Sequence, residues 1–352
     1  MLLFFLKNLQ KNGISTEIYS LINNEEIRPS ANIVISKCSA YDYLNNSIPN
    51  IEKMTVKYYD TFSITSRFTG YITNITIGDF YNNFSSPDSD STAILGGLNA
   101  TARKENESSE SSLNGSSESD SSSGSSSSSG SGSGGSSDSG GSETINSQES
   151  SLEDTNVITN PEELTAGTSS VMGNRGTENI GIAVFKEDKL CGELTATESI
   201  CHLLIGNAID SCIITIDSPL IENKKMELQL IPSKKSKISV DIKDNKIYAS
   251  VNIKLDADIL TLEDGINYEE TETLNKVSIA AEEYLKSEFN DYLNKISKEY
   301  ETDIDHFCVK ALSHFVTNSE WESFNWKEKF KNAEFDVHID VNTISSLLVT
   351  KT

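Results

Sequence analysis

The sequence lacks the features that mark several large protein classes. It has five cysteines among 352 residues, none paired as Cys-x-x-Cys and none at metal-ligand spacing from a histidine, so neither a disulfide framework nor a zinc site is expected. We interpret the cysteines as small buried hydrophobic residues. No apolar run approaches the roughly 20 residues of a membrane-spanning helix. The apolar start, residues 1–6, is also too short for a signal peptide, which needs a positive region and about 7–15 apolar residues.

Motifs of common catalytic sites are also missing. There is no Gly-x-Ser-x-Gly elbow, no His-Glu-x-x-His and no phosphate-binding P-loop. Asp336, His338 and Asp340 alternate along one predicted strand, and their side chains could touch a cation, but we interpret them as a solvated strand face. We interpret the four histidines as structural: His202, His306, His314 and His338. The chain is therefore predicted not to be an enzyme and to need no cofactor or metal.

Negative charge dominates the chain and gathers in its middle. The formal net charge is −24, and residues 105–178 hold 13 acidic residues against one arginine. An acidic surface repels the phosphate backbone, so nucleic acid is not an expected partner. Residues 121–142 are almost wholly serine and glycine, and such a chain cannot offset the ordering entropy of about 1–2 kcal/mol per residue. We predict a disordered linker over residues 101–178, between modules at 1–100 and 179–352.

The first module has a mixed pattern of strands and helices. Strands are predicted at residues 1–6 and 31–36, the second apolar enough to be interior to a sheet. Ser15 or Thr16 is the expected cap of the first helix. The predicted helical segments cover residues 18–22, 40–44, 51–65 and 77–84.

The second module opens on a hairpin. Strands at 181–185 and 190–194 flank a charged turn, Lys186 to Lys189, that we interpret as solvated. Thr195-x-x-Glu198 predicts a capping box at the start of a helix. Further strands are expected at 211–218, 226–231, 237–242, 246–255 and 333–345, and helices at 271–300, 303–315 and 320–330. The predicted fold class is α+β, with an N-terminal mixed α/β piece and a C-terminal domain of mostly antiparallel sheet packed against a long helix and shorter helices.

Three sequence motifs in this order resemble those of a known family. The first contains Glu25, Ile27, Arg28 and Pro29 and precedes the predicted strand at 31–36. The second is a helix entry with Gly78, Asp79 and Phe80. The third contains Gly181, Val184, Phe185, Lys186, Asp188, Lys189 and Leu190. Together with Trp321, Trp326 and the strand around residues 335–341, they resemble the Ger(x)C family of spore germination proteins, the C subunits of germinant receptors.

The resemblance implies a non-catalytic subunit of a nutrient-sensing receptor. Members of the family are lipoproteins at the outer face of the spore inner membrane, beside polytopic A- and B-type subunits, and act in nutrient-triggered germination. They begin with a lipoprotein signal and a lipidated cysteine. This chain shows neither the signal nor the anchor, so we expect it to be N-terminally incomplete. The alternative interpretation is an extracytoplasmic small-ligand-binding module unrelated to germination.

Overall fold

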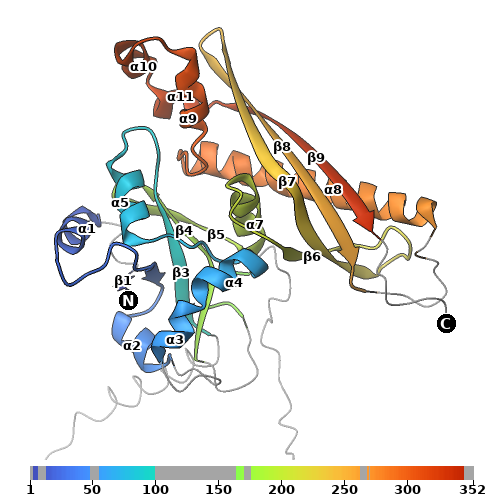
Figure 1. The fold of residues 1–352 in the computed structure, drawn as a ribbon, viewed down its shortest axis with the longest axis horizontal. Helices are drawn as coiled ribbons and strands as arrows, with labels where there is room; N and C mark the ends of the chain where they lie inside the picture. Colours follow the sequence, from blue (N-terminus) through green and yellow to red (C-terminus); the bar gives the residue numbers. More distant parts are fainter. Residues whose placement is uncertain are drawn as a thin grey trace, which may run out of the picture.

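The computed structural model has two β-sheets with helices packed on them (Figure 1). The α+β class is as predicted. A five-stranded sheet is formed mostly by the first part of the chain, and a four-stranded sheet by the second part. The structure describes residues 3–6, 13–47, 55–99, 164–169, 176–261, 268 and 270–344.

The first sheet combines strands from both sides of the predicted linker. Its order is β1-β2-β3-β4-β5, with β1 to β3 parallel and β3 to β5 antiparallel. The hairpin β4–β5 has the predicted position, but it continues the sheet of the first module. No strand was predicted for β3, because its two glycines and the polar run before it hide its apolar residues. The strands are β1 (Leu3–Leu6), β2 (Ile33–Ser36), β3 (Thr92–Leu98), β4 (Thr177–Lys186) and β5 (Lys189–Leu194).

Helices cover both faces of this sheet. On one face, Ile18 of α1 and Phe80 of α5 pack against strand residues such as Phe185. On the other face, Phe62 of α4 packs against Val34 and Ile94. The helices are α1 (Ser15–Ile22), α2 (Ala40–Asn45), α3 (Thr55–Asp60), α4 (Phe62–Thr69) and α5 (Ile77–Ser85).

Two helix predictions in this module need correction. The helix predicted at 51–65 forms as α3 and α4, with residues 51–54 outside the described part. It breaks at Thr61, a β-branched residue of low helix propensity. Ser15 and Thr16 already belong to α1, so neither is its cap. The cap position is occupied by Ile14, and no side-chain hydrogen bond caps the helix.

The predicted linker extends too far at its C-terminal end. Residues 164–169 and 176–178 belong to the fold, whereas 101–163 and 170–175 lie outside the described residues. The backbone carbonyl of Leu164 accepts from the N–H of Ala196 at 2.9 Å, and the Ala166 N–H donates to Ile180 at 2.8 Å. These bonds join the polar stretch to the start of the helix at Ala196 and to β4, so composition alone did not reveal them.

The second sheet has the order β6-β7-β8-β9. Its first three strands are antiparallel as predicted, but β9 runs parallel to β8. The two strands predicted at 226–231 and 237–242 form one strand, β7, with an irregular register between Pro232 and Lys237. Asp244 and Asn245, with φ of 48° and 65°, form the tight turn to β8. The strands are β6 (Cys212–Asp217), β7 (Lys225–Lys243), β8 (Lys246–Ile259) and β9 (Glu334–Ile344).

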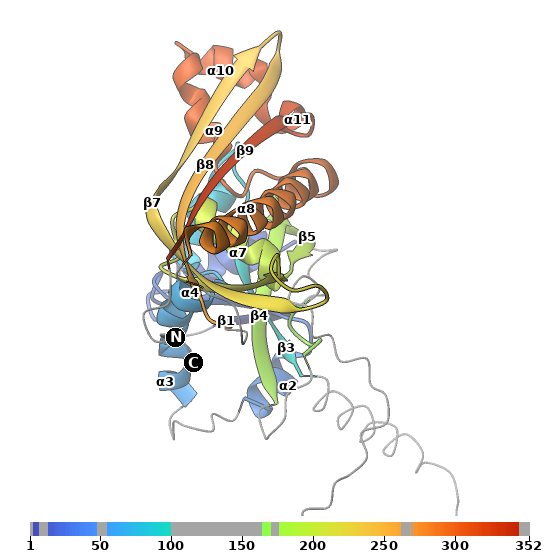
Figure 2. The same ribbon diagram turned by 90° about the vertical axis from the view of Figure 1, so that its right-hand side faces the viewer.

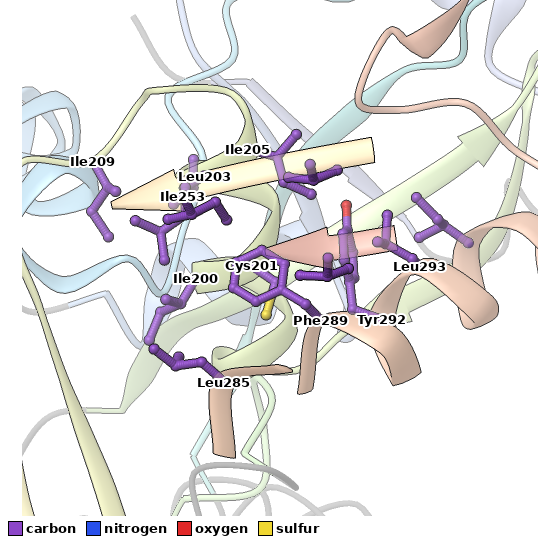
Figure 3. Packing of buried hydrophobic residues seen from close by; sticks show 14 of the residues in the cluster. Ile200, Cys201, Leu203, Ile205, Ile209, Ile253, Leu285, Phe289, Tyr292 and Leu293 are labelled. Atoms are coloured by element: carbon purple, nitrogen blue, oxygen red, sulfur yellow. The ribbon is translucent and has the colours of Figure 1, made fainter. Parts of the chain in front are cut away.

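Two helices, α7 (Ala196–Ile205) and α8 (Thr271–Asn294), pack against the apolar face of this sheet. The predicted capping box of Thr195 and Glu198 opens α7. Figure 3 shows Ile200 and Cys201 of α7 facing Leu285 and Phe289 of α8. A π-helical turn, Lys295–Glu299, extends α8, so the helix predicted to residue 300 is confirmed with a changed last turn.

Short helices gather near the tip of the β7–β8 hairpin, which reaches away from the first sheet (Figures 1 and 2). They are shorter than predicted at 303–315 and 320–330. The second predicted helix is divided at Asn325, whose φ is +52° and which therefore ends one helix before the next begins. The helices are α9 (Phe307–Ala311), α10 (Asn318–Phe324) and α11 (Trp326–Phe330).

Candidate functional site

The β4–β5 hairpin lies between two hydrophobic cores. Successive strand residues point to opposite faces of a sheet. Val184 belongs to the larger core around α7, α8 and the second sheet, whereas Phe185 belongs to the smaller core around α1 and α5. Both side chains are buried. The hairpin is thus the element through which the two parts of the chain are packed together.

Gly181 lies where the register between β3 and β4 shifts. Its φ is +93°, and a Cβ atom there would lie 2.4 Å from the carbonyl oxygen of Leu194. Its N–H donates to the carbonyl of Tyr71 at 2.7 Å. A side chain at this position would therefore be strained in conformation and would clash with β5.

The first and second sequence motifs meet at the N-terminus of α5. The carbonyl of Pro29 accepts from the N–H of Gly78 at 2.9 Å, and Ala31 accepts from Ile77 at 2.8 Å. Asp79 completes a capping box with Thr76. These bonds satisfy N–H groups that a helix start otherwise leaves without a partner.

The side chains of the first motif divide between core and surface. Ile27 packs against the smaller core. Glu25 and Arg28 are exposed, and neither side chain makes a hydrogen bond or an ion pair with another residue of the described part. The loop is held in place by its backbone hydrogen bonds and by the Ile27 side chain. The charged groups of Glu25 and Arg28 are left on the surface.

Two aromatic residues join the second and third motifs. The rings of Phe80 and Phe185 lie edge to face, with centroids 5.1 Å apart at 84°. Leu190, also of the third motif, is buried in the same core. The three motifs, predicted from separate places in the sequence, therefore form one contiguous structural unit.

The turn of the hairpin is less solvated than the sequence suggested. Glu187 and Lys189 are exposed as expected. Asp188, however, accepts a hydrogen bond from Ser15 Oγ at 3.1 Å, and its carbonyl accepts from the N–H of Ile14 at 2.8 Å. Lys186 forms an ion pair with Glu301, beyond the end of α8. The prediction of a solvated turn is therefore wrong for these two residues, because their partners come from distant segments.

Asp90 joins three segments next to this turn. Its side chain is fully buried and accepts from Lys327 Nζ at 3.1 Å, from the N–H of Glu187 at 3.2 Å and from the N–H of Asp303 at 3.2 Å. A buried carboxylate is stable only with such partners. Asp90 thus holds the end of the α5–β3 loop against the hairpin turn and the C-terminal helices.

Asp303, whose N–H donates to Asp90, is a second buried carboxylate. We call the contacts of Asp90 and Asp303, between the α5–β3 loop, the hairpin turn and the C-terminal helices, the junction. It accepts from the N–H groups of Phe307 at 2.9 Å and Cys308 at 2.8 Å, and from Trp326 Nε1 at 3.0 Å. Burial raises the pKa of Asp303 to about 7, against the opposing effect of these donors.

A shallow groove borders the same junction. It has a volume of about 340 Å³, and Trp321 Nε1 donates to Asp88 Oδ2 at 2.7 Å beside it. The rings of Trp321 and Trp326 are buried beside it, and the groove exposes both polar and apolar groups. Its lining consists of Pro87, Asp88, Asn318, Trp321, Glu322, Asn325, Trp326 and Lys327.

Comparisons with known proteins match both ends of the chain. A family model described as "Spore germination protein N-terminal domain" matches residues 1–98, and one described as "Spore germination B3/ GerAC like, C-terminal" matches residues 180–346. The chain belongs to this GerAC-like family of spore germination proteins. The resemblance to Ger(x)C proteins is thereby confirmed.

A solved structure has a related fold. The structure titled "Crystal Structure of the GerBC protein" aligns with a TM-score of 0.60 at 14% sequence identity, over 97% of this chain and 78% of that chain. At this identity the likeness concerns the fold. Among curated proteins, none matches the chain.

A third polar group of this GerAC-like chain is centred on Asp305, which is also buried. Asp305 binds His202 Nδ1 at 2.7 Å and accepts from the Tyr292 hydroxyl at 2.8 Å. The pKa of Tyr292 is raised well above its ordinary value, first by burial and then by Asp305, so the phenol stays protonated and donates. The group ties α7 and α8 to the segment before α9, which is a structural role for the histidine, as predicted.

The cysteines offer little nucleophilic character. Burial raises the pKa of Cys191 and of Cys212 to about 12, and a thiol rather than a thiolate is a poor nucleophile. All five cysteines are free, and Cys201, Cys212 and Cys308 are buried. The interpretation as buried hydrophobic residues is confirmed for these three, whereas Cys38 and Cys191 are only partly buried.

Within the described ranges, no group of three or more histidine, cysteine or acidic side chains is placed to hold a metal ion. On β9, Asp336 pairs with His338 at 2.9 Å, and Asp340 pairs with Lys254. These exposed pairs agree with the interpretation of a solvated strand face. Among the described helices, none has the length and apolar character to span a membrane.

Sequence reasoning missed the acidic residues that hold the junction. Asp88 and Asp90 stand in a polar run, Ser85 to Ser91, that is typical of a surface loop. The partner of Asp90, Lys327, is 237 positions away. Only the buried strand that follows the run would have pointed to a loop held against the fold.

Proposed function

We propose that this chain is a non-catalytic C subunit of a spore germinant receptor. The observation that carries the proposal is the pair of family matches in family order, one at each end of the chain. In this proposal the subunit acts in nutrient-triggered germination at the outer face of the spore inner membrane. Its partners are polytopic A- and B-type subunits, and its membrane association uses the lipid anchor typical of the family.

The junction supports a role in binding rather than in catalysis. Its carboxylates, Asp90 and Asp303, accept hydrogen bonds from groups that hold segments of the chain together. A general base needs access to a substrate proton, but both side chains are buried. The polar groups of the junction therefore support a rigid two-sheet body whose surface meets partners.

Germination of mutant spores tests the proposal directly. Deleting the gene should abolish the fall in optical density that at least one nutrient mixture causes, and a wild-type copy should restore it. Decoated spores treated with lysozyme serve as the control, because this enzyme degrades the cortex without a receptor. An unchanged response to every nutrient for which the strain germinates would contradict the proposal.

Isolation of the complex separates this function from the small-ligand alternative. Pulldown of the tagged chain from detergent-solubilised spore membranes should recover polytopic A- and B-type subunits. The control is a tagged unrelated lipoprotein from the same membranes. Tight binding of a soluble ligand by the purified chain, together with no membrane complex, would favour the ligand-binding module instead.

A further inference from the structure

One edge of β7 carries lysines that the junction does not use. Lys234, Lys235 and Lys237 are exposed, and none pairs with another residue of the described part. From Leu228 to Val240 the sequence has these three lysines and no aspartate or glutamate, although the whole chain has a net charge of −24. The segment is therefore a local positive site on an acidic protein.

The backbone under these lysines is held in place. The pairing of β7 with β8 shifts between Lys234, opposite Lys254, and Lys237, opposite Asn252, so one extra residue is accommodated. Within this bulge, Ser236 donates through its N–H to Asn207 Oδ1 at 2.6 Å and through Oγ to the carbonyl of Leu204 at 2.7 Å. The bulge is thus fixed to the end of α7.

Neighbouring carboxylates do not neutralise the bulge. Asp210, just after α7, pairs with Arg67 at 2.9 Å. Asp340, across from Lys254 on β9, pairs with that lysine at 2.5 Å. On β8, Asp256 lies opposite Ile231 and accepts a hydrogen bond from Asn342 Nδ2 at 3.1 Å. None of these three acids forms an ion pair with a bulge lysine, so the charge of the three lysines remains available to a partner.

Exposed aliphatic side chains lie beside the bulge. Ile231 is 37% exposed, and Ile213 on β6 is 46% exposed. Ile213 is opposite Gln229, and Gln229 shares a strand face with Ile231, so the two isoleucines are diagonal neighbours. Lysines next to exposed aliphatic groups are typical of surfaces that rest on anionic membranes.

We propose that this lysine edge, defined as Lys234, Lys235, Lys237, Ile213 and Ile231, docks on an anionic lipid bilayer. The inference rests on the membrane location in the proposed function and names the surface that faces the lipid. Lysines are point charges, which suit a diffuse field of headgroups better than the paired geometry that arginine offers to a protein carboxylate. Without the three lysines the rest of the chain carries −27, so repulsion from the bilayer would orient the protein with this edge toward it.

The same lysines have a second explanation that the test must separate. β6 pairs with β7 only from Lys225 to Leu230, so the bulge lies on an unpaired sheet edge. Lysines on such edges prevent pairing with other chains. If that is their only role, removing them should promote self-association and leave lipid binding unchanged.

Sedimentation with lipid vesicles tests the proposal on the purified full chain. Vesicles of about 40% phosphatidylglycerol in phosphatidylcholine should bind the chain at about 50 mM salt, and the partition should fall steeply at about 500 mM salt. Each lysine near an anionic surface changes the partition about fivefold, so K234Q/K235Q/K237Q should lower it about a hundredfold. Pure phosphatidylcholine vesicles should bind the wild type no better than the variant.

A charge-matched variant is the control. K243Q/K246Q/K276Q removes the same charge from lysines that pair with Asp241, Glu334 and Glu272, and it should change the partition less than about threefold. An equal loss of vesicle partition in both variants, or no binding of the wild type to anionic vesicles, would overturn the proposal that the lysine edge docks on lipid. Self-association of K234Q/K235Q/K237Q with an unchanged partition would also overturn it. Because no spore is used, these failures are distinguishable from failure of the proposed germination role.

Discussion

The two hairpins of this protein differ in how many of their faces are buried. The β4–β5 hairpin is short, and Val184 and Phe185 bury its two faces in two different cores. The β7–β8 hairpin is long, and only one of its faces is buried, by residues such as Val251 and Leu255. Its other face and its edge carry charged side chains.

This difference separates the residues that hold the fold from those free to meet a partner. A hairpin with core residues on both faces tolerates few substitutions at its buried positions, because the side chains of either face contact a core. A hairpin buried on one face can change its outer side chains at little cost in stability. The family motif around Gly181 therefore reports on structure, while the β7 edge is where binding properties can vary.

Phe185→Ala should have the largest effect on stability. It removes a buried ring that packs against Phe80, and such losses cost about 3–5 kcal/mol of the free energy of unfolding. Ile231→Ala on the other hairpin should cost less than about 0.5 kcal/mol, because that side chain is partly exposed. Urea unfolding followed by tryptophan fluorescence and far-UV circular dichroism measures both.

The same experiment tests whether the first hairpin couples the two cores. Trp321 and Trp326 belong to the larger core, whereas Phe185 belongs to the smaller one. If the hairpin joins them, the tryptophan transition should shift with Phe185→Ala. An unshifted tryptophan signal, with a separate early transition in circular dichroism, would show that the cores unfold independently.

Asp90→Ala should have the second largest effect on stability. It leaves the N–H groups of Glu187 and Asp303 without their acceptor and Lys327 without its counter-charge. We expect a loss of about 2–4 kcal/mol in the free energy of unfolding. Asp241→Ala on β7 is the matched control, because its exposed pair with Lys243 contributes at most about 1 kcal/mol. Equal losses in the two variants would remove the distinction between the junction and the long hairpin.

The pH dependence of stability should come partly from Asp303. Burial raises its pKa to about 7 in the folded chain, whereas an unfolded aspartate titrates near 3.9. The folded chain therefore keeps a proton that the unfolded chain releases between about pH 4 and 7. The stability from this group is complete below pH 4 and is lost as the pH rises toward 7.

Asp303→Asn isolates that contribution. The free energy of unfolding of the wild type minus that of the variant should fall by roughly 1 kcal/mol per pH unit across this window. Asp241→Asn, which replaces an exposed aspartate on β7, is the matched control. If this difference in the free energy of unfolding instead rises with pH, the three N–H donors, rather than burial, control the pKa of the Asp303 carboxyl group.

The sequence revealed the hairpins better than their surroundings. Alternation of apolar and polar residues defined β8 and β9, and the apolar run with a charged turn defined β4–β5, because these signals are local. The partner of β4 was missed, since β3 comes from before the linker and its pairing is not encoded in either segment alone.

The candidate site was only partly accessible from the sequence. The motif residues Phe80, Gly181 and Phe185 were recognised by resemblance, but their mutual contact was not predicted. Asp90 gave no signal, because a surface loop and a buried polar loop have the same composition, and the burial of Asp303 was not predicted. Such residues become visible only when the partners, here Glu187 and Lys327, are brought together by the fold.

The smallest effect is expected at the lysine edge. K234Q/K235Q/K237Q removes three exposed charges that make no pair in the described part of the chain, so the free energy of unfolding should change by less than about 0.5 kcal/mol. The hydrogen bonds of Ser236 to Leu204 and Asn207 keep the bulge in place without the charges. Urea unfolding at about 50 and 500 mM salt measures the change. A loss above about 1 kcal/mol would show that the lysines support the fold, and the two hairpins would then differ in degree rather than in role.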